Sequence, residues 1–166
     1  MMKCVLFVLL AAMLTMVPGA VSARDSLGIY GSWGAFRDPA VPRCYAVAKA
    51  RPSTLQRSNV PYVSIGTWPR RGVRGQVHFR LSRNIRKGSD LRLTIGGRRF
   101  AMVGAEGNGW AANRTMDAAI VAAMRSAERM TVRGRDNQGR PFSDRYELDG
   151  AATAMDAATV GCARRR

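Results

Sequence analysis

The feature that most constrains this chain is an alternation of apolar and polar residues in three segments of its middle part. Residues 76–81 (QVHFRL) have an apolar side chain at every second position, and Tyr62–Trp68 and Leu91–Ile95 repeat this period of two. A period of two places every second side chain on the same face of a β-strand. The short connections between the segments favour antiparallel pairing, with one face of the sheet packed and the other in water.

The remainder of the chain predicts further strands and two helices. Residues 115–128 (TMDAAIVAAMRSAE) lack Gly and Pro and carry apolar side chains at helical spacing, with Thr115 as the expected N-cap. We therefore predict a mainly β, antiparallel, sandwich-like domain with this main helix packed on it and a short C-terminal helix. Gly96-Gly97 predicts a hairpin turn, the further strand candidates are residues 26–36, 43–48, 100–103, 129–133 and 142–148, and the C-terminal helix is expected at residues 151–160.

The N-terminus has the pattern of a cleavable export signal. Lys3 precedes an uncharged, almost wholly apolar run at residues 4–17, which a Pro-Gly pair ends. A membrane-spanning helix needs about 20 apolar residues, so this run favours a signal peptide over a retained anchor. Small residues at Val21 and Ala23 suit a signal peptidase site, and we expect cleavage after Ala23, with Ala20 as the weaker alternative.

This pattern divides the chain into a signal peptide, residues 1–23, and a single exported β-rich domain, residues 24–166. No second apolar run in the sequence reaches spanning length, so we expect no transmembrane segment in the mature chain. The expected location is the periplasm, the outer surface or the medium.

Two cysteines, Cys44 and Cys162, remain once the signal is removed. An even number of cysteines in an exported domain favours a disulfide. Such a disulfide would close a loop of more than about 100 residues and would stabilise the fold by up to about 5 kcal/mol. Metal ligation and a nucleophilic thiol are the alternatives. Two cysteines and the single His78, scattered along the chain, are a poor set of zinc ligands, and we expect no metal and no cofactor.

The chain is strongly basic, with a net charge of +16. Such a charge favours anionic surroundings, among them lipopolysaccharide, phospholipid head groups, acidic glycans and nucleic acid. The alternative is that the abundance of arginine reflects a GC-rich coding sequence. Clusters of basic residues in the predicted turns would form one cationic rim if the hairpin ends point the same way. The alternative is that these residues are simply solvated in separate turns. The anion-binding candidates are Arg70, Arg71, Arg74, Arg83, Arg86, Lys87, Arg98 and Arg99.

No catalytic motif is evident, whether a nucleophile elbow, a zinc-protease signature, a Walker motif or a Cys-x-x-Cys pair. His78 falls on the predicted solvent face, where a lone histidine is more often inert. Asp144, Glu147 and Asp149 cluster near a predicted strand, and Glu106 sits in a Gly-rich turn. We therefore expect no catalytic residues and no enzyme. The alternative is a hydrolase of envelope polysaccharide, whose two facing carboxylates the sequence does not place.

Several aromatic, cysteine and glycine positions follow one another in a distinctive order along residues 30–162. They are Trp33, Pro42-x-Cys44-Tyr45, Phe100, Trp110, Ala122-Ala123-Met124-Arg125, Met130-Thr131-Val132-x-Gly134, Asp144-x-Tyr146-x-Leu148-x-Gly150 and Cys162. This order resembles the invasion-associated locus B family of alphaproteobacterial exported proteins.

The resemblance implies a periplasmic or outer-surface β-rich domain with no established catalysis, linked in pathogens to host-cell invasion. It brings no catalytic residues to this chain and maps only Cys44 and Cys162, as a structural pair. Together with the charge, it leads us to expect a non-enzymatic surface protein that binds anionic cell-surface components or a protein partner. With no nucleic-acid-binding motif in the sequence, nucleic acid is an unlikely partner.

Overall fold

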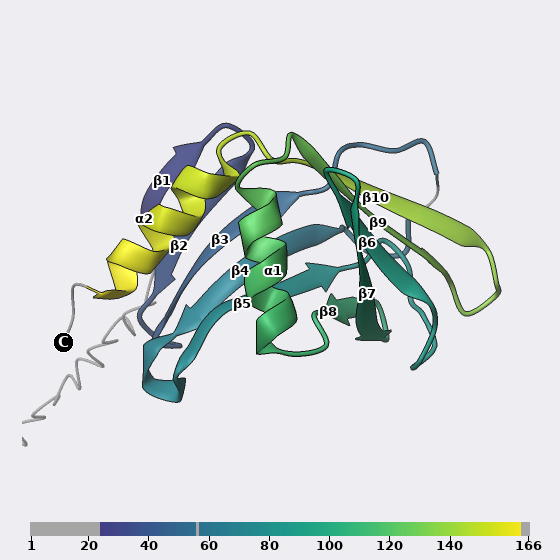
Figure 1. Cartoon of the computed structure of the whole chain (residues 1–166), viewed down its shortest axis with the longest axis horizontal. Coiled ribbons are helices and arrows are strands. Elements are labelled where there is room, and N and C mark those ends of the chain that lie inside the picture. Colours follow the sequence, from purple (N-terminus) through teal and green to yellow (C-terminus); the bar gives the residue numbers. More distant parts are fainter. Residues whose placement is uncertain (1–23, 56, 164–166) are drawn as a thin grey trace, which may run out of the picture.

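The alternating segments lie side by side in one antiparallel sheet in the computed structural model of this chain, which describes residues 24–55 and 57–163. The expected signal peptide and its cleavage after Ala23 lie outside the described residues. Ten strands follow the spatial order β1-β2-β3-β4-β5-β8-β7-β6-β9-β10 (Figure 1). Their bounds are β1 (Asp25–Tyr30), β2 (Trp33–Asp38), β3 (Arg43–Lys49), β4 (Tyr62–Trp68), β5 (Val73–Arg80), β6 (Leu91–Ile95), β7 (Arg98–Ala105), β8 (Asn108–Trp110), β9 (Arg129–Arg135) and β10 (Pro141–Glu147).

The alternation assigns the two faces of the sheet as the sequence predicts. Ile65 of β4 lies opposite Ala46 of β3 and Val77 of β5, and all three are buried on the inner face. Both helices pack on this inner face, α2 over β1–β3 and α1 against β5, β6 and β7 (Figure 1). The fold is therefore mainly antiparallel β with two helices, which confirms the predicted fold class.

The sheet curls until its two ends share one core, which accounts for its sandwich-like character. The rings of Phe79 from β5 and Tyr146 from β10 meet with centroids 5.7 Å apart. The Trp33 indole N–H of β2 donates to the Glu147 carbonyl oxygen of β10 at 2.9 Å. The backbone N–H of Arg51, just after β3, donates to the Arg145 carbonyl oxygen at 2.8 Å. The last strand of the sheet therefore returns to strands near its beginning.

Helix α1 (Arg114–Met124) begins one residue earlier and ends four residues earlier than the sequence predicts. Its N-cap is Asn113 rather than Thr115, and the Asn113 side chain accepts the backbone N–H of Met116 at 2.9 Å. Asp117 in the first turn accepts the backbone N–H of Val77 at 2.8 Å, where β5 has no β8 partner. One buried carboxylate thus joins the helix to the sheet.

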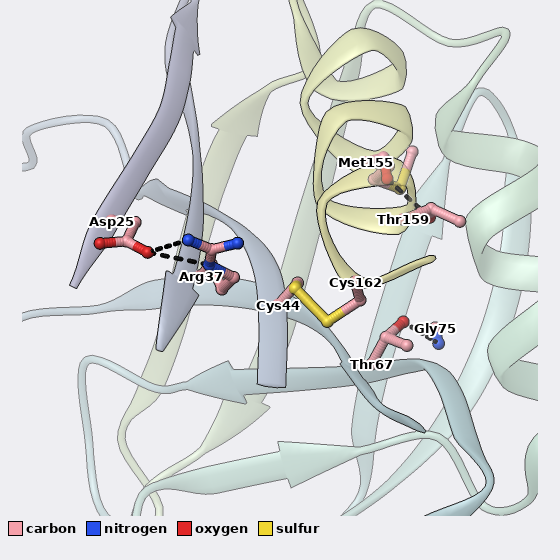
Figure 2. The surroundings of a disulfide bond; sticks show 8 residues. All are labelled: Asp25, Arg37, Cys44, Thr67, Gly75, Met155, Thr159 and Cys162. Carbon is pink, nitrogen blue, oxygen red and sulfur yellow. Dashed lines mark hydrogen bonds and ion pairs between the residues drawn. A yellow bond between two sulfur atoms is a disulfide. The ribbon is translucent and has the colours of Figure 1, made fainter. Parts of the chain in front are cut away.

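Helix α2 (Ala151–Ala163) runs three residues beyond its predicted end and is joined covalently to β3. Cys162 in its last turn forms a disulfide with Cys44, with Cα atoms 5.7 Å apart, so the pairing predicted from the sequence is present (Figure 2). Gly150 precedes the helix at φ 82°, and a side chain there would overlap the carbonyl of Tyr30. No helix in the described part of the chain has the length and apolar character to span a membrane.

Two local predictions differ from the structure. Residues 26–36 were expected as one strand, but Gly31 at φ 54° turns the chain and produces the β1–β2 hairpin. Strand β8 was not predicted, because three residues, two of them polar or glycine, show too little alternation. It forms because its neighbours β5 and β7 supply backbone partners on both sides.

Candidate anion-binding site

The structure does not bring the eight predicted anion-binding residues into one rim. Arg70 and Arg71 lie in η1 (Pro69–Arg71), the turn between β4 and β5, and Arg74 follows at the start of β5. That turn lies at the lower ends of β4 and β5 in Figure 1, and Arg70 lines a small cavity of about 200 Å³ together with Cys162. The other candidates lie around β6, β7 and β9.

Arg83 is not available to a ligand, which corrects its assignment as a candidate. It is only 9% exposed, and its Nη1 lies 3.2 Å from Oδ2 of Asp136. Arg140 donates its Nε–H to the same oxygen at 2.8 Å. Burial acts to raise the pKa of Asp136, but the hydrogen bonds from the Arg140 backbone and side chain outweigh it and leave the pKa below its usual value. Arg83 therefore neutralises a structural carboxylate.

A different set of arginines gathers on the outer surface of β6, β9 and β10, which we call the arginine face. Its side chains alternate with the buried ones and so point away from both helices. Arg92 of β6 lies directly opposite Arg133 of β9, which in turn lies opposite Ser143 of β10. The members of the face are Arg92, Thr94, Arg129, Thr131, Arg133, Arg135, Ser143 and Arg145.

An open groove of about 950 Å³, the arginine groove, runs along one part of this face. The predicted residues Arg86 and Arg99 line it beside Arg92, Arg133 and Arg135. Its two aspartates are already paired, Asp90 with Arg92 at 2.8 Å and Asp136 as described above. Among the described residues, no carboxylate forms an ion pair with Arg99, Arg133 or Arg135. The groove therefore presents positive charge that the protein itself does not neutralise.

Of the remaining predicted residues, Lys87 is exposed in the connection between β5 and β6. Arg98 stacks its guanidinium on the Phe100 ring, 5.4 Å from the centroid. The sequence did not indicate the arginines of β9 and β10 as candidates, because they are spread along strands and do not cluster in predicted turns. Their signal was present, since the basic and hydroxyl residues of Arg129–Arg135 recur with the strand period of two.

The acidic residues considered for catalysis are not brought together. Asp144 is buried on the inner face of β10 and accepts the backbone N–H of Ser82 at 2.8 Å. Burial raises the pKa of Asp144, and the hydrogen bond from Ser82 opposes that rise. Glu147 points to the outer face and pairs with Arg51 at 2.6 Å, while Glu106 is exposed in the turn before β8. Asp144 and Glu147 thus lie on opposite sides of one strand and do not face each other across a cleft.

The outer surface at the other end of the sheet, the aromatic face, carries Phe36, Tyr45, Tyr62, His78 and Trp110. The Phe36 and Tyr45 rings stack at 5.7 Å, and the ring of His78 lies 5.9 Å from that of Tyr62 and 5.4 Å from that of Trp110. His78 occupies the outer face as predicted, but it is half-buried. Burial lowers the pKa of His78, and its 3.0 Å hydrogen bond to Asn108 opposes that shift.

Comparisons with known proteins agree with this fold. The model of a family described as invasion associated locus B (IalB) protein matches residues 36–159. The chain is also similar to the crystal structure of invasion associated protein B from Bartonella henselae, with a TM-score of 0.57 and 15% sequence identity. The match covers 84% of this chain and 97% of that one, and at this identity it shows the fold alone. No curated protein matches the chain.

Proposed function

The chain belongs to the invasion associated locus B family, and from this premise we propose that it is a non-enzymatic exported protein that binds anionic components of a cell surface. The observation that carries the proposal is the arginine groove, where Arg99, Arg133 and Arg135 have no carboxylate partner among the described residues. Guanidinium groups form bidentate hydrogen bonds with phosphate and carboxylate groups. A surface with this excess of charge binds anionic head groups and acidic glycans.

The place of action follows from the export pattern at residues 1–23 and from the disulfide. Disulfides persist in oxidising compartments such as the periplasm and the cell surface. The bacterial envelope and the surface of a host cell are both rich in anionic groups, so the same arginine face would serve contact with either. An envelope protein with an acidic surface is the other partner that this chemistry admits.

Binding to vesicles tests the arginine groove directly. The triple variant R99Q/R133Q/R135Q should lose affinity for vesicles containing phosphatidylglycerol by roughly 100-fold, at about 1 kcal/mol for each arginine near the surface. The matched control R70Q/R71Q/R74Q removes the same charge from the β4–β5 turn, and it should lose less than about tenfold. Equal losses in the two variants would show that only total charge matters and would contradict this assignment.

A salt series on intact cells extends the test to the biological surfaces. Binding of the purified protein to bacterial envelopes and to host cells should fall as sodium chloride rises from about 0.05 to 0.5 M, because exposed charges are screened over a shorter distance. Binding that persists at high salt would point to an apolar contact instead.

The absence of enzymatic activity is tested separately. The purified protein should release no products from peptidoglycan or acidic glycans.

A further inference from the structure

A further cavity lies on another part of the arginine face, and its chemistry is more specific than that of the open groove. Residues 51–55 pass alongside β10, where the Arg51 N–H donates to the Arg145 carbonyl oxygen at 2.8 Å. The Arg57 side chain holds this segment by donating to the Arg51 carbonyl oxygen at 2.6 Å. Residues of this segment, β9 and β10 line a cavity of about 540 Å³, which we call the loop pocket. Its size is typical of a small-molecule site.

Positive charge dominates the loop pocket. Four arginines line it, Arg51, Arg57, Arg129 and Arg145, against the single carboxylate of Glu147. Glu147 is occupied by Arg51 at 2.6 Å, and Arg129 has only a long contact of 3.7 Å with an exposed Glu128. In the described part of the chain no carboxylate pairs with Arg57 or Arg145. The pocket thus has an excess of positive charge suited to a ligand with two negative charges.

Hydroxyl groups with unused hydrogen-bonding capacity line the same pocket. Ser143 Oγ is buried and has no hydrogen-bond partner among the described residues, whereas the Tyr146 ring points into the core. A buried polar group without a partner is unfavourable unless a bound molecule satisfies it. Thr131, Ser53 and Thr54 add three further hydroxyls to the wall.

We propose that the loop pocket binds a phosphomonoester group carried on a larger polar molecule. A phosphomonoester is close to a dianion at neutral pH and has three terminal oxygens that accept hydrogen bonds, which matches two unpaired guanidinium groups and several hydroxyls. The cavity is larger than a phosphate ion, which leaves room for an attached sugar or glycerol. This inference rests on the proposed function, because it names the anionic group that the exported protein would recognise.

Isothermal titration with glucose 6-phosphate tests the pocket, with glucose and inorganic phosphate as the reference ligands. We expect R145Q to weaken glucose 6-phosphate binding by about tenfold or more, because the Arg145 side chain makes no hydrogen bond within the described structure that its loss would disturb. S143A should weaken binding by about threefold to tenfold without lowering stability. The control R71Q removes one exposed charge from the β4–β5 turn, away from the pocket and from the arginine groove, and it should change the affinity less than about threefold.

Vesicles distinguish a free phosphorylated sugar from a lipid as the source of the phosphate. Vesicles of phosphatidic acid carry a phosphomonoester, whereas phosphatidylglycerol vesicles carry a phosphodiester. A preference for phosphatidic acid that R145Q removes supports a lipid source, and binding of glucose 6-phosphate alone supports a soluble one. Equal weakening of glucose 6-phosphate binding by R145Q and R71Q would show that only the total charge matters, which would overturn the pocket and leave general anion binding intact. The pocket would also be overturned if none of the phosphomonoester probes bound while phosphatidylglycerol vesicles still did. The proposed function fails only if those vesicles do not bind either.

Discussion

The outer face of the sheet carries aromatic rings at one end and guanidinium groups at the other, whereas its inner face is mostly apolar. On the aromatic face, ring contacts join Phe36 to Tyr45 and His78 to both Tyr62 and Trp110. On the arginine face, Arg92 lies directly opposite Arg133. Cross-strand aromatic pairs stabilise a sheet, and like charges directly opposite each other destabilise it. Outward-facing residues therefore stabilise the sheet at its aromatic end and destabilise it at its arginine end.

This difference shows where function is expected on such a fold. The inner positions are restricted by packing against α1, α2 and the opposite end of the sheet, so most of them are apolar at both ends. The outer positions have no such restriction. Half-buried rings and the nearby disulfide add stability at the aromatic end. The arginines add none and oppose one another, which is understandable if an anion binds between them.

The largest expected effect is the loss of the disulfide, which belongs to the aromatic end of the sheet. The double variant C44S/C162S should lower the free energy of unfolding by about 2–5 kcal/mol, because a long loop is no longer closed in the unfolded chain. Urea unfolding followed by circular dichroism measures this loss. Vesicle binding under folding conditions should be unchanged. Unfolding at the same urea concentration as the parent would show that stability does not depend on this tether.

Removing a ring from the aromatic face should have the next largest effect. We expect W110A to lower the free energy of unfolding by about 1.5–3 kcal/mol, less than for a fully buried ring because Trp110 is half-buried. Its cross-strand neighbour Val103 is 50% exposed, and V103A serves as the smaller control. Thermal unfolding and vesicle binding are measured together. A change in vesicle affinity caused by W110A would break the division of roles between the two faces.

The arginine face should respond in the opposite direction. R133Q should raise the free energy of unfolding by about 0.2–1 kcal/mol, because it removes the repulsion between Arg133 and Arg92. R71Q removes one exposed charge that has no arginine opposite it, and should change stability by less than about 0.5 kcal/mol. Chemical unfolding at low ionic strength is the measurement, since salt screens the repulsion. A destabilised R133Q would mean that this arginine makes a stabilising contact in the folded chain.

The smallest expected effect is the pH dependence contributed by His78. Its pKa in the folded chain lies below the usual value of 6.5, because burial disfavours the charged ring. Protonation therefore favours the unfolded chain, so this contribution to stability is present above pH 6.5 and is lost as the pH falls toward the folded-state pKa. H78Q should remove that part of the slope between about pH 7 and 5, with the carboxylates unchanged. Parallel plots of unfolding free energy against pH for H78Q and the parent protein would contradict this assignment.

The strands of the middle part were predictable because their residues alternate over five or more positions. Strand β8 was not, since it depends on neighbours on both sides, and the break at Gly31 was not, since it depends on a positive φ that the residue pattern does not reveal. The candidate site was predicted in part. Arg86 and Arg99 do line the arginine groove, but Arg83 belongs to a buried ion pair with Asp136. Sequence clusters in turns did not show which arginines already have a carboxylate partner.

The sequence by itself determined the antiparallel β class and the positive charge, because the period of two and the residue counts do not depend on how the chain folds. The Cys44–Cys162 pair was favoured by the sequence, and the tertiary structure brings its two ends together across 118 residues. Only the tertiary structure decided that Arg92, Arg133 and Arg145, from three different strands, share one face, and that residues 51–55 and Arg57 line a pocket on it. Register between strands and the return of β10 toward β3 depend on contacts far apart in the sequence, and those contacts decide which like charges are left side by side.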